Sequence, residues 1–185
     1  ITAEGATLYE SQVILEYLAD KHASRLKQPC RPSTLAARTK SRLLIAVHDM
    51  YISGPNCTQD GYFGNQGVMY KKNMADDERK ARTADLAKQL DVIEGLLDES
   101  GPFASGAEIS LADCVLYPTY IFVTELAPVA LGWPELSARP KSAKWFAHME
   151  AHPVVGKIGA DVKGFCAKVL VPNAQAICES MKASL

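Results

Sequence analysis

An acidic residue and a hydroxyl-bearing residue stand next to each other near the start of the printed sequence, in the run Leu8-Tyr9-Glu10-Ser11-Gln12. The sequence predicts that Glu10 and Ser11 lie where an extended segment passes into a helix. Backbone N–H groups at a helix start have no partner inside the helix, and the helix dipole is positive there, so carboxylates bind well at such positions. The pair is therefore a candidate site for a small anionic ligand. The alternative is that Ser11 only caps the helix and that Glu10 is a solvated charge.

A second pair with local chemistry is Ser110 and Asp113, in the run Ile109-Ser110-Leu111-Ala112-Asp113. Ser110 can accept a hydrogen bond from the N–H at the third helical position, while the Asp113 carboxylate reaches back to the N–H of Ser110. This is a capping box, with Asp in place of Glu. A buried carboxylate could also be catalytic, but the spacing already explains this one. We therefore interpret Ser110 and Asp113 as structural capping residues.

The first pair must be positioned by the segments on either side of it. Ala6-Thr7-Leu8-Tyr9 has moderate strand propensity and Gly5 fits a turn, so we expect residues 1–9 to be extended and to form a strand. The helix that follows should end near His22, and it carries an apolar stripe of Val13, Ile14, Tyr17 and Leu18. A single strand is not stable alone, and the printed sequence begins with Ile1. We therefore expect this chain to be a piece of a longer protein.

A linker and a helical domain should follow. Residues 24–33 contain Pro29 and Pro32, which interrupt helices, so a domain boundary is predicted there. From residue 34 to residue 185 the pattern is helical nearly throughout. One long helix is predicted with Ser33 or Thr34 as its cap. Its inner face should carry Leu43, Leu44, Val47 and Tyr51. A second has apolar residues at helical spacing, namely Leu86, Leu90, Ile93 and Leu97. Two short helices are predicted at 154–168 and 172–182, and the fold class is mainly α.

Composition narrows the class of protein. The chain has 185 residues, of which 48% are hydrophobic, and a formal net charge of −1, so it can build a sizeable core. Acidic and basic residues are interspersed along the chain, and no basic stripe is present. We therefore expect no nucleic-acid partner. No apolar run approaches the roughly 18 residues of a membrane span, and we expect no membrane partner.

The spacing of the cysteines and histidines matches no metal-binding or redox motif. Five widely separated cysteines without a CxxC pair favour a reduced, cytoplasmic location, with an organellar address left open. Cys57 has no nearby cation that clearly lowers its pKa, and we expect an ordinary thiol. His22, His148 and His152 lack the spacing of metal ligands, so no metal is expected.

The order of the two motifs, with a proline-bearing linker between them, resembles the glutathione S-transferase family over essentially the whole chain. The resemblance implies that residues 1–23 are the end of a thioredoxin-like glutathione-binding domain and that residues 34–185 are the all-helical C-terminal domain. It also implies a role for each residue of the first pair. Glu10 would meet the ammonium group of glutathione, and Ser11, with the Ser11 and Gln12 N–H groups, would meet its α-carboxylate.

The resemblance further implies a transferase that joins the glutathione thiolate to a small hydrophobic electrophile and forms a homodimer. Candidates for the electrophile site are His48 and Tyr51, on the first long helix, and Tyr62, in the aromatic loop. Packing is an equal alternative for Tyr51, and a surface Asp-His face for His48. The family's catalytic Ser, Tyr or Cys would precede Ile1, so we assign no catalytic residue and expect this piece to be inactive alone. Two alternatives stay open: a Cys-type thiol transferase or dehydroascorbate reductase, and a non-catalytic interaction module.

Overall fold

The computed structural model describes Thr2 and residues 5–25, 30–54, 65–72, 74–133 and 136–183. Within these residues the chain is mainly helical, as predicted, and contains no strand. The α-helices of this described part are α1 (Ser11–Lys21), α2 (Leu35–Val47), α3 (Asp76–Leu96), α4 (Leu111–Leu131), α5 (Pro140–Ala151), α6 (Val155–Phe165) and α7 (Val171–Ala183). Shorter segments are the π-helical η1 (His48–Ser53) and η4 (Cys166–Leu170) and the 3-10 helices η2 (Asn65–Met69) and η3 (Leu136–Ala138).

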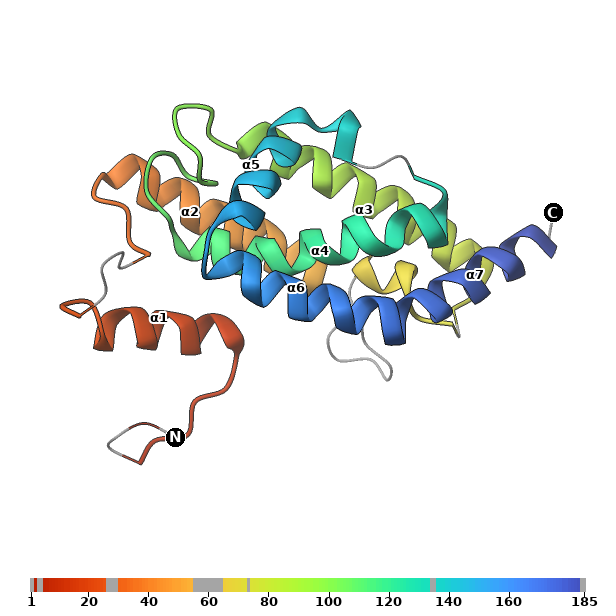
Figure 1. The fold of residues 1–185 in the computed structure, drawn as a ribbon, viewed down its shortest axis with the longest axis horizontal. Helices are drawn as coiled ribbons and strands as arrows, with labels where there is room; N and C mark the ends of the chain where they lie inside the picture. The colour runs from red at the N-terminus through yellow and green to blue at the C-terminus, as the bar shows by residue number, and fades with distance from the viewer. Residues whose placement is uncertain are drawn as a thin grey trace.

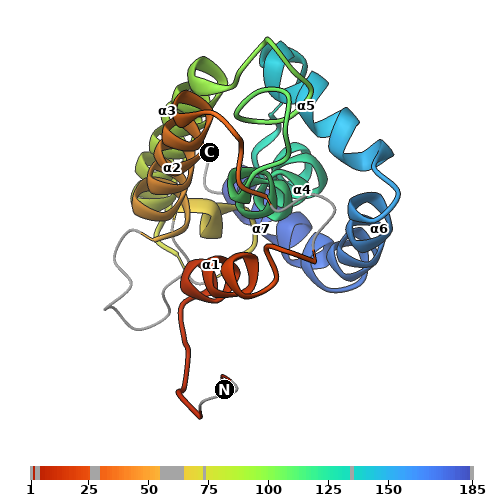
Figure 2. The same cartoon turned by 90° about the vertical axis from the view of Figure 1, so that its left-hand side faces the viewer.

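Helix α4 is the centre of the bundle. Figure 2 shows α2 and α3 on one side of α4 and α5 and α6 on the other, and α7 packs along α4 as well. Leu116, Tyr120 and Leu126 of α4 are completely buried. The Tyr120 ring meets Trp145 of α5 edge-on, with ring centroids 5.2 Å apart. Side chains of α4 thus join the two sides into one core.

The composition of α4 follows from this position. By length and apolarity, α4 is the one helix of the described residues that could cross a membrane, and half of its apolar stretch is buried in the fold. The expectation that no apolar run approaches such a length is therefore wrong for residues 111–131. A helix that is apolar on all sides has to be enclosed, and here α2, α5, α6 and α7 pack against it.

Helix α2 begins at the second of the two predicted caps. Thr34 is its N-cap, and Thr34 Oγ1 accepts a hydrogen bond from the Ala37 N–H at 3.2 Å. Of the predicted inner face, Leu44 and Val47 are buried, but Leu43 and Tyr51 are each 47% exposed. The prediction is wrong for those two residues. The π-helical η1 has more residues per turn than an α-helix, which rotates the register, and Ile52 is buried in place of Tyr51.

The predicted apolar face of α3 is confirmed, because Leu86, Leu90, Ile93 and the following Leu97 are all buried. The last part of the chain differs from the prediction of two separate short helices. Helices α6 and α7 are continuous with η4 between them, and Pro172 lies in the first turn of α7. Proline lacks an N–H, and the wider π-helical turn before it takes up the interruption without a loop.

The segment before α1 contains the predicted turn but not the predicted strand. The Gly5 N–H donates to the Thr2 carbonyl at 3.0 Å, and Gly5 has a φ of +83°, which suits glycine. Residues 6–9 form no strand. A strand requires a neighbour with which to share ladder hydrogen bonds, and the described residues offer none here.

Candidate functional site

The residue before α1 has an unusual backbone. Glu10 is the N-cap of α1, with φ 69° and ψ 115°, and its side chain is exposed and makes no capping hydrogen bond. A positive φ is uncommon outside glycine, and this ψ lies outside the left-handed helical well. Such a conformation costs on the order of 1–3 kcal/mol and is concentrated at functional sites. The outlier therefore marks the same residue that the sequence pattern marks.

The first turn of α1 leaves hydrogen-bonding groups unused. Its first internal bond runs from the Ile14 N–H to the Glu10 carbonyl, at 3.0 Å. No side chain caps the preceding N–H groups, and no acidic residue lies in the first turn. The Ser11 side chain is exposed. Gln12 Nε2 donates to Glu16 at 3.0 Å, while Gln12 Oε1 is buried without a partner in the described part of the chain.

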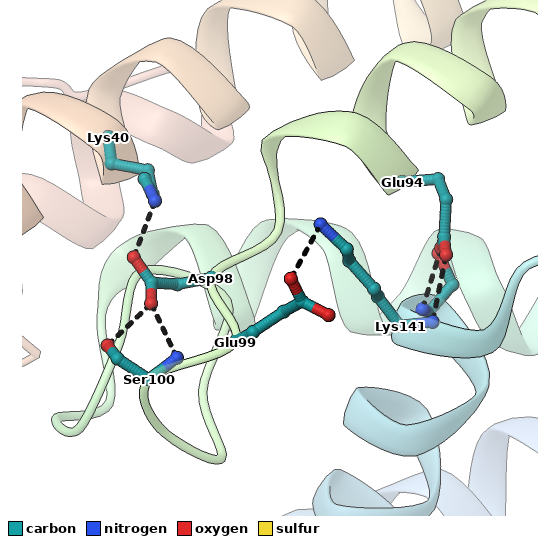
Figure 3. Close-up of polar contacts among 7 residues, drawn as sticks. Lys40, Glu94, Asp98, Glu99, Ser100 and Lys141 are labelled. Atoms are coloured by element: carbon teal, nitrogen blue, oxygen red, sulfur yellow. Dashed lines mark hydrogen bonds and ion pairs between the residues drawn. The ribbon is translucent and has the colours of Figure 1, made fainter.

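Helices α2 to α5 differ from α1, because the start of each has a capping hydrogen bond or an acidic side chain from within the protein. Thr34 caps α2, acidic residues fill the first turn of α3, and Asp113 occupies that of α4. Figure 3 shows the case of α5, where Glu94 of α3 accepts the N–H groups of Lys141 and Ser142, both at 2.8 Å. Among these five helices, α1 is thus the one whose start has neither a capping hydrogen bond nor an acidic side chain in its first turn, which leaves it open to an anion from outside.

Helix α1 is joined to the bundle through the segment that follows it. Asp20, near the end of α1, forms an ion pair with Arg31 at 2.6 Å. The Cys30 carbonyl accepts the N–H of Leu111, the first residue of α4, at 3.1 Å. In Figure 1, α1 and α2 run in opposite directions. The start of α1, at Ser11, therefore lies toward the same side of the view as the end of α2, where η1 begins.

Asp113 is a structural centre of the helical domain. Its carboxylate is completely buried, and Oδ2 accepts from both the N–H and the hydroxyl of Ser110, each at 2.8 Å. Oδ1 accepts from the Ala104 N–H and from Trp145 Nε1, again at 2.8 Å each. The capping box between Ser110 and Asp113 is therefore present. The same carboxylate also fixes the preceding loop and α5, which the sequence pattern did not predict.

The loop before α4 is held from two directions. Asp98 accepts from Lys40 of α2 at 2.5 Å and from Ser100, and Glu99 pairs with Lys141 of α5 at 3.3 Å (Figure 3). The hydrogen bond from Lys40, followed by those from Ser100, holds the pKa of Asp98 well below its ordinary value. Behind this loop lies a cavity of about 430 Å³, with Trp145 and His148 in its lining.

The candidates for an electrophile site have different surroundings. His48 is buried, and its two ring nitrogens are each 2.7 Å from an oxygen, Asp49 Oδ1 and Thr119 Oγ1. Its ring therefore connects η1 to α4. Tyr51 is 47% exposed on η1 and remains a candidate by position. Tyr62, and with it Cys57, lies outside the described residues.

No group of three or more His, Cys, Asp or Glu in the described ranges could hold a metal ion. The sequence analysis also missed one contact between groups that can react with each other, the thiols of Cys30 and Cys114. These cysteines are far apart in the chain, and only the return of the linker to the start of α4 brings them together. No local motif indicates such a contact.

The comparison with known families first defines the class of the helical domain. Residues 76–150 match the model of the glutathione S-transferase C-terminal domain. This region contains α3, α4 and α5, together with Ser110 and Asp113. Its architecture is thus that of the second domain of this class of protein.

Individual relatives agree with this assignment. The chain is 32% identical over 155 residues to glutathione S-transferase theta-1 of Rattus norvegicus, and the match covers 83% of the chain and 60% of that protein. The chain thus spans about 60% of the length of this relative. The match to the family model and this similarity together support the assignment of the chain to the glutathione S-transferase family.

Solved structures share the fold at lower identity. Human glutathione transferase theta-2, in complex with glutathione and an unknown ligand, is 20% identical, with a TM-score of 0.65 over 91% of this chain and 67% of that one. A diazinon-metabolizing glutathione S-transferase of the silkworm Bombyx mori is 21% identical, with a TM-score of 0.63 over 87% and 70% of the two chains. These likenesses show the fold.

Proposed function

We propose that the protein to which this chain belongs is a glutathione transferase and that the start of α1 holds the γ-glutamyl end of glutathione. The observation that carries the proposal is the strained, open start of α1, with Glu10 at φ 69° and no internal cap. The similarity of the chain to glutathione S-transferases and the glutathione named in the theta-2 complex support this choice of ligand.

The chemistry of the ligand matches the groups at this helix start. The γ-glutamyl end carries one ammonium and one α-carboxylate. The exposed Glu10 carboxylate attracts the ammonium, and the Ser11 hydroxyl with the Ser11 and Gln12 N–H groups accommodates the carboxylate at the positive end of the helix dipole. Because α1 has no acidic side chain in its first turn, no carboxylate of that turn competes with the ligand.

The reaction we propose is the transfer of glutathione to a small hydrophobic electrophile. The thiolate sulfur forms a bond to the electrophilic carbon, and either a leaving group departs with the bonding electron pair or the carbon takes up a proton after addition. We assign no residue of this chain to activation of the thiol. Tyr51 and Tyr62 are the candidates for contact with the electrophile, and the proposal includes a homodimer in a reducing compartment.

Steady-state kinetics of the full-length protein with a hydrophobic electrophile test the role of Glu10. Glu10→Gln removes the charge that faces the ammonium and should raise the KM for glutathione about tenfold with little change in kcat, because the contact exists equally in the ground and transition states. The matched control is Glu179→Gln on the exposed side of α7, which should leave both constants unchanged. Equal KM values for wild type and Glu10→Gln contradict the assignment.

A second substitution separates binding from capping. Glu10→Gly should relieve the backbone strain at φ 69° and raise the melting temperature, yet it should also weaken glutathione binding. If Glu10 affected only the conformation of the helix start, the melting temperature and the affinity for glutathione would change in the same direction. An increase in both for Glu10→Gly would therefore count against a binding role of Glu10.

A further inference from the structure

Two thiols from distant parts of the chain meet where the linker reaches the helical domain. Cys30 follows α1, and its carbonyl accepts the Leu111 N–H at 3.1 Å, which anchors it to the first turn of α4. Cys114 belongs to the same turn, and the two thiols are hydrogen-bonded to each other. Neither cysteine forms a disulfide in this structure, and both are only partly buried. Cysteines in contact can form a disulfide with small adjustments of the backbone.

The surroundings of Cys30 favour an anionic reagent. A small cavity of about 50 Å³ is lined by Cys30 together with Arg31, Arg38, Arg42 and Glu16. Arg31 also pairs with Asp20, and Arg38 donates to the carbonyls of Pro32 and Ser33. With Arg31 paired to Asp20, Arg38 and Arg42 against Glu16 leave a net positive charge in the lining of the cavity that Cys30 shares. Reactive cysteines occur in electropositive, partly exposed positions of this kind.

We propose that Cys30 is a site of thiol–disulfide exchange with glutathione disulfide, and that Cys114 resolves the product to a Cys30–Cys114 disulfide. The Cys30 thiolate attacks one sulfur of glutathione disulfide, so a mixed disulfide forms and one glutathione thiolate leaves. The Cys114 thiolate then attacks Cys30 Sγ, and the second glutathione leaves as a thiolate. The two cysteines are oxidised by two electrons in total, glutathione disulfide is reduced to two glutathione molecules, and the two cysteine protons pass to solvent or to the leaving thiolates.

The division of roles between the thiols follows from their contact. The hydrogen bond with Cys114 lowers the pKa of Cys30 to about 7, against the opposing effects of burial and of Asp113. The same hydrogen bond, followed by burial, raises the pKa of Cys114. Cys30 is thus the attacking thiolate at neutral pH. Once Cys30 carries a glutathionyl group, its negative charge no longer opposes the ionisation of Cys114, which can then act as the resolving thiol.

The disulfide would tie the linker covalently to α4 and so restrict how α1 sits against the bundle. This exchange goes beyond the proposed transferase function and does not use Glu10 or Ser11. Glu10→Gln should therefore leave the exchange unchanged while it weakens glutathione binding. Failure of one proposal can be distinguished from failure of the other.

Mass spectrometry of the folded protein tests the proposal directly. The reduced protein is incubated with glutathione disulfide at neutral pH, blocked with an alkylating agent in denaturant, digested and mapped. The wild type should lose two hydrogen atoms and yield a peptide pair linked through Cys30 and Cys114. Cys114→Ser should stop at one glutathionyl group on Cys30, Cys30→Ser should leave Cys114 unmodified, and the control Cys178→Ser on α7 should match the wild type. A wild type that keeps Cys30 reduced while Cys178 is modified overturns the proposal.

Alkylation of folded protein provides a measurement that does not depend on the cross-link. The rate constant for Cys30 with iodoacetamide should rise with a midpoint near pH 7 in the wild type. In Cys114→Ala the midpoint should move to higher pH, because alanine cannot donate the hydrogen bond that stabilises the Cys30 thiolate. If the midpoint for Cys30 in the folded wild type equals the midpoint in the denatured protein, the proposed reactivity is contradicted. This comparison needs no variant, so it holds even if a variant fails to fold.

Discussion

The substitution Asp113→Asn probes the group that connects most elements of the helical domain. Asp113 is completely buried and accepts four hydrogen bonds of 2.8 Å, from the Ser110 N–H and hydroxyl, from the Ala104 N–H and from Trp145 Nε1. Asparagine has the same shape but only one accepting oxygen. The consequences of the exchange can therefore be counted bond by bond.

The least costly arrangement keeps the asparagine oxygen toward Ala104 and Trp145, because both of these groups can only donate. The amide nitrogen then faces Ser110, whose hydroxyl can rotate to accept, but the Ser110 N–H loses its partner. An unpaired buried donor costs about 1–3 kcal/mol, and the loss of charge weakens the bonds that remain. We expect Asp113→Asn to lower the free energy of unfolding by about 3 kcal/mol. Asp113→Ala leaves three buried N–H groups unpaired and should remove most of a typical total of about 5–15 kcal/mol.

Urea denaturation followed by far-ultraviolet circular dichroism measures both effects. The matched control is Asp161→Asn on the exposed face of α6, which should change stability by less than about 0.5 kcal/mol. An Asp113→Asn variant as stable as this control would refute the reasoning, because it would mean that the four hydrogen bonds contribute nothing net.

Two further predictions concern stability. A Cβ added at Gly156 would lie 2.1 Å from the Glu150 carbonyl oxygen, so Gly156→Ala should destabilise the protein by about 1–3 kcal/mol. Nothing lies within 4 Å of a Cβ added at Gly95 in α3, so Gly95→Ala should stabilise the protein by about 0.5–1 kcal/mol. Thermal denaturation measures both effects. The lowered pKa of Asp98 means that its ionised form stabilises the fold above the ordinary value of 3.8 and that this contribution is lost as the pH falls below that value. Asp98→Asn should accordingly cost about 1 kcal/mol at neutral pH and progressively less under acid conditions, and a constant difference across the pH range would show that the charge is not involved.

Local patterns in the sequence predicted much of the helical domain. The Thr34 cap and the face of Leu86, Leu90 and Ile93 depend on residues within one or two turns of each other, and helix geometry is set at that range. The π-helical register of η1 could not be predicted in the same way. This segment also makes a contact between distant parts of the chain, from His48 to Thr119 in α4.

In the candidate site, too, the features set by neighbouring residues were predictable and those set by contacts between distant segments were not. The pair Glu10 and Ser11 is visible in the sequence because a hydroxyl and an acid precede an apolar helical stripe. The strain at Glu10 is a property of the backbone and has no sequence signal for a non-glycine residue. The contact of Cys30 with Cys114 and the hydrogen bond from Trp145 to Asp113 depend on the packing of separate helices. Spacing along the chain carries no information on them.

Calorimetric titration of glutathione into the full-length protein tests most directly whether the start of α1 binds the γ-glutamyl carboxylate. Ser11→Ala removes a hydroxyl at the positive end of the helix, and the loss of a charge-assisted hydrogen bond should weaken binding by about 1.5–3 kcal/mol, which corresponds to roughly 10- to 150-fold in Kd. The control Ser24→Ala, at an exposed position after α1, should bind as the wild type does. A Kd that Ser11→Ala leaves unchanged would contradict the account.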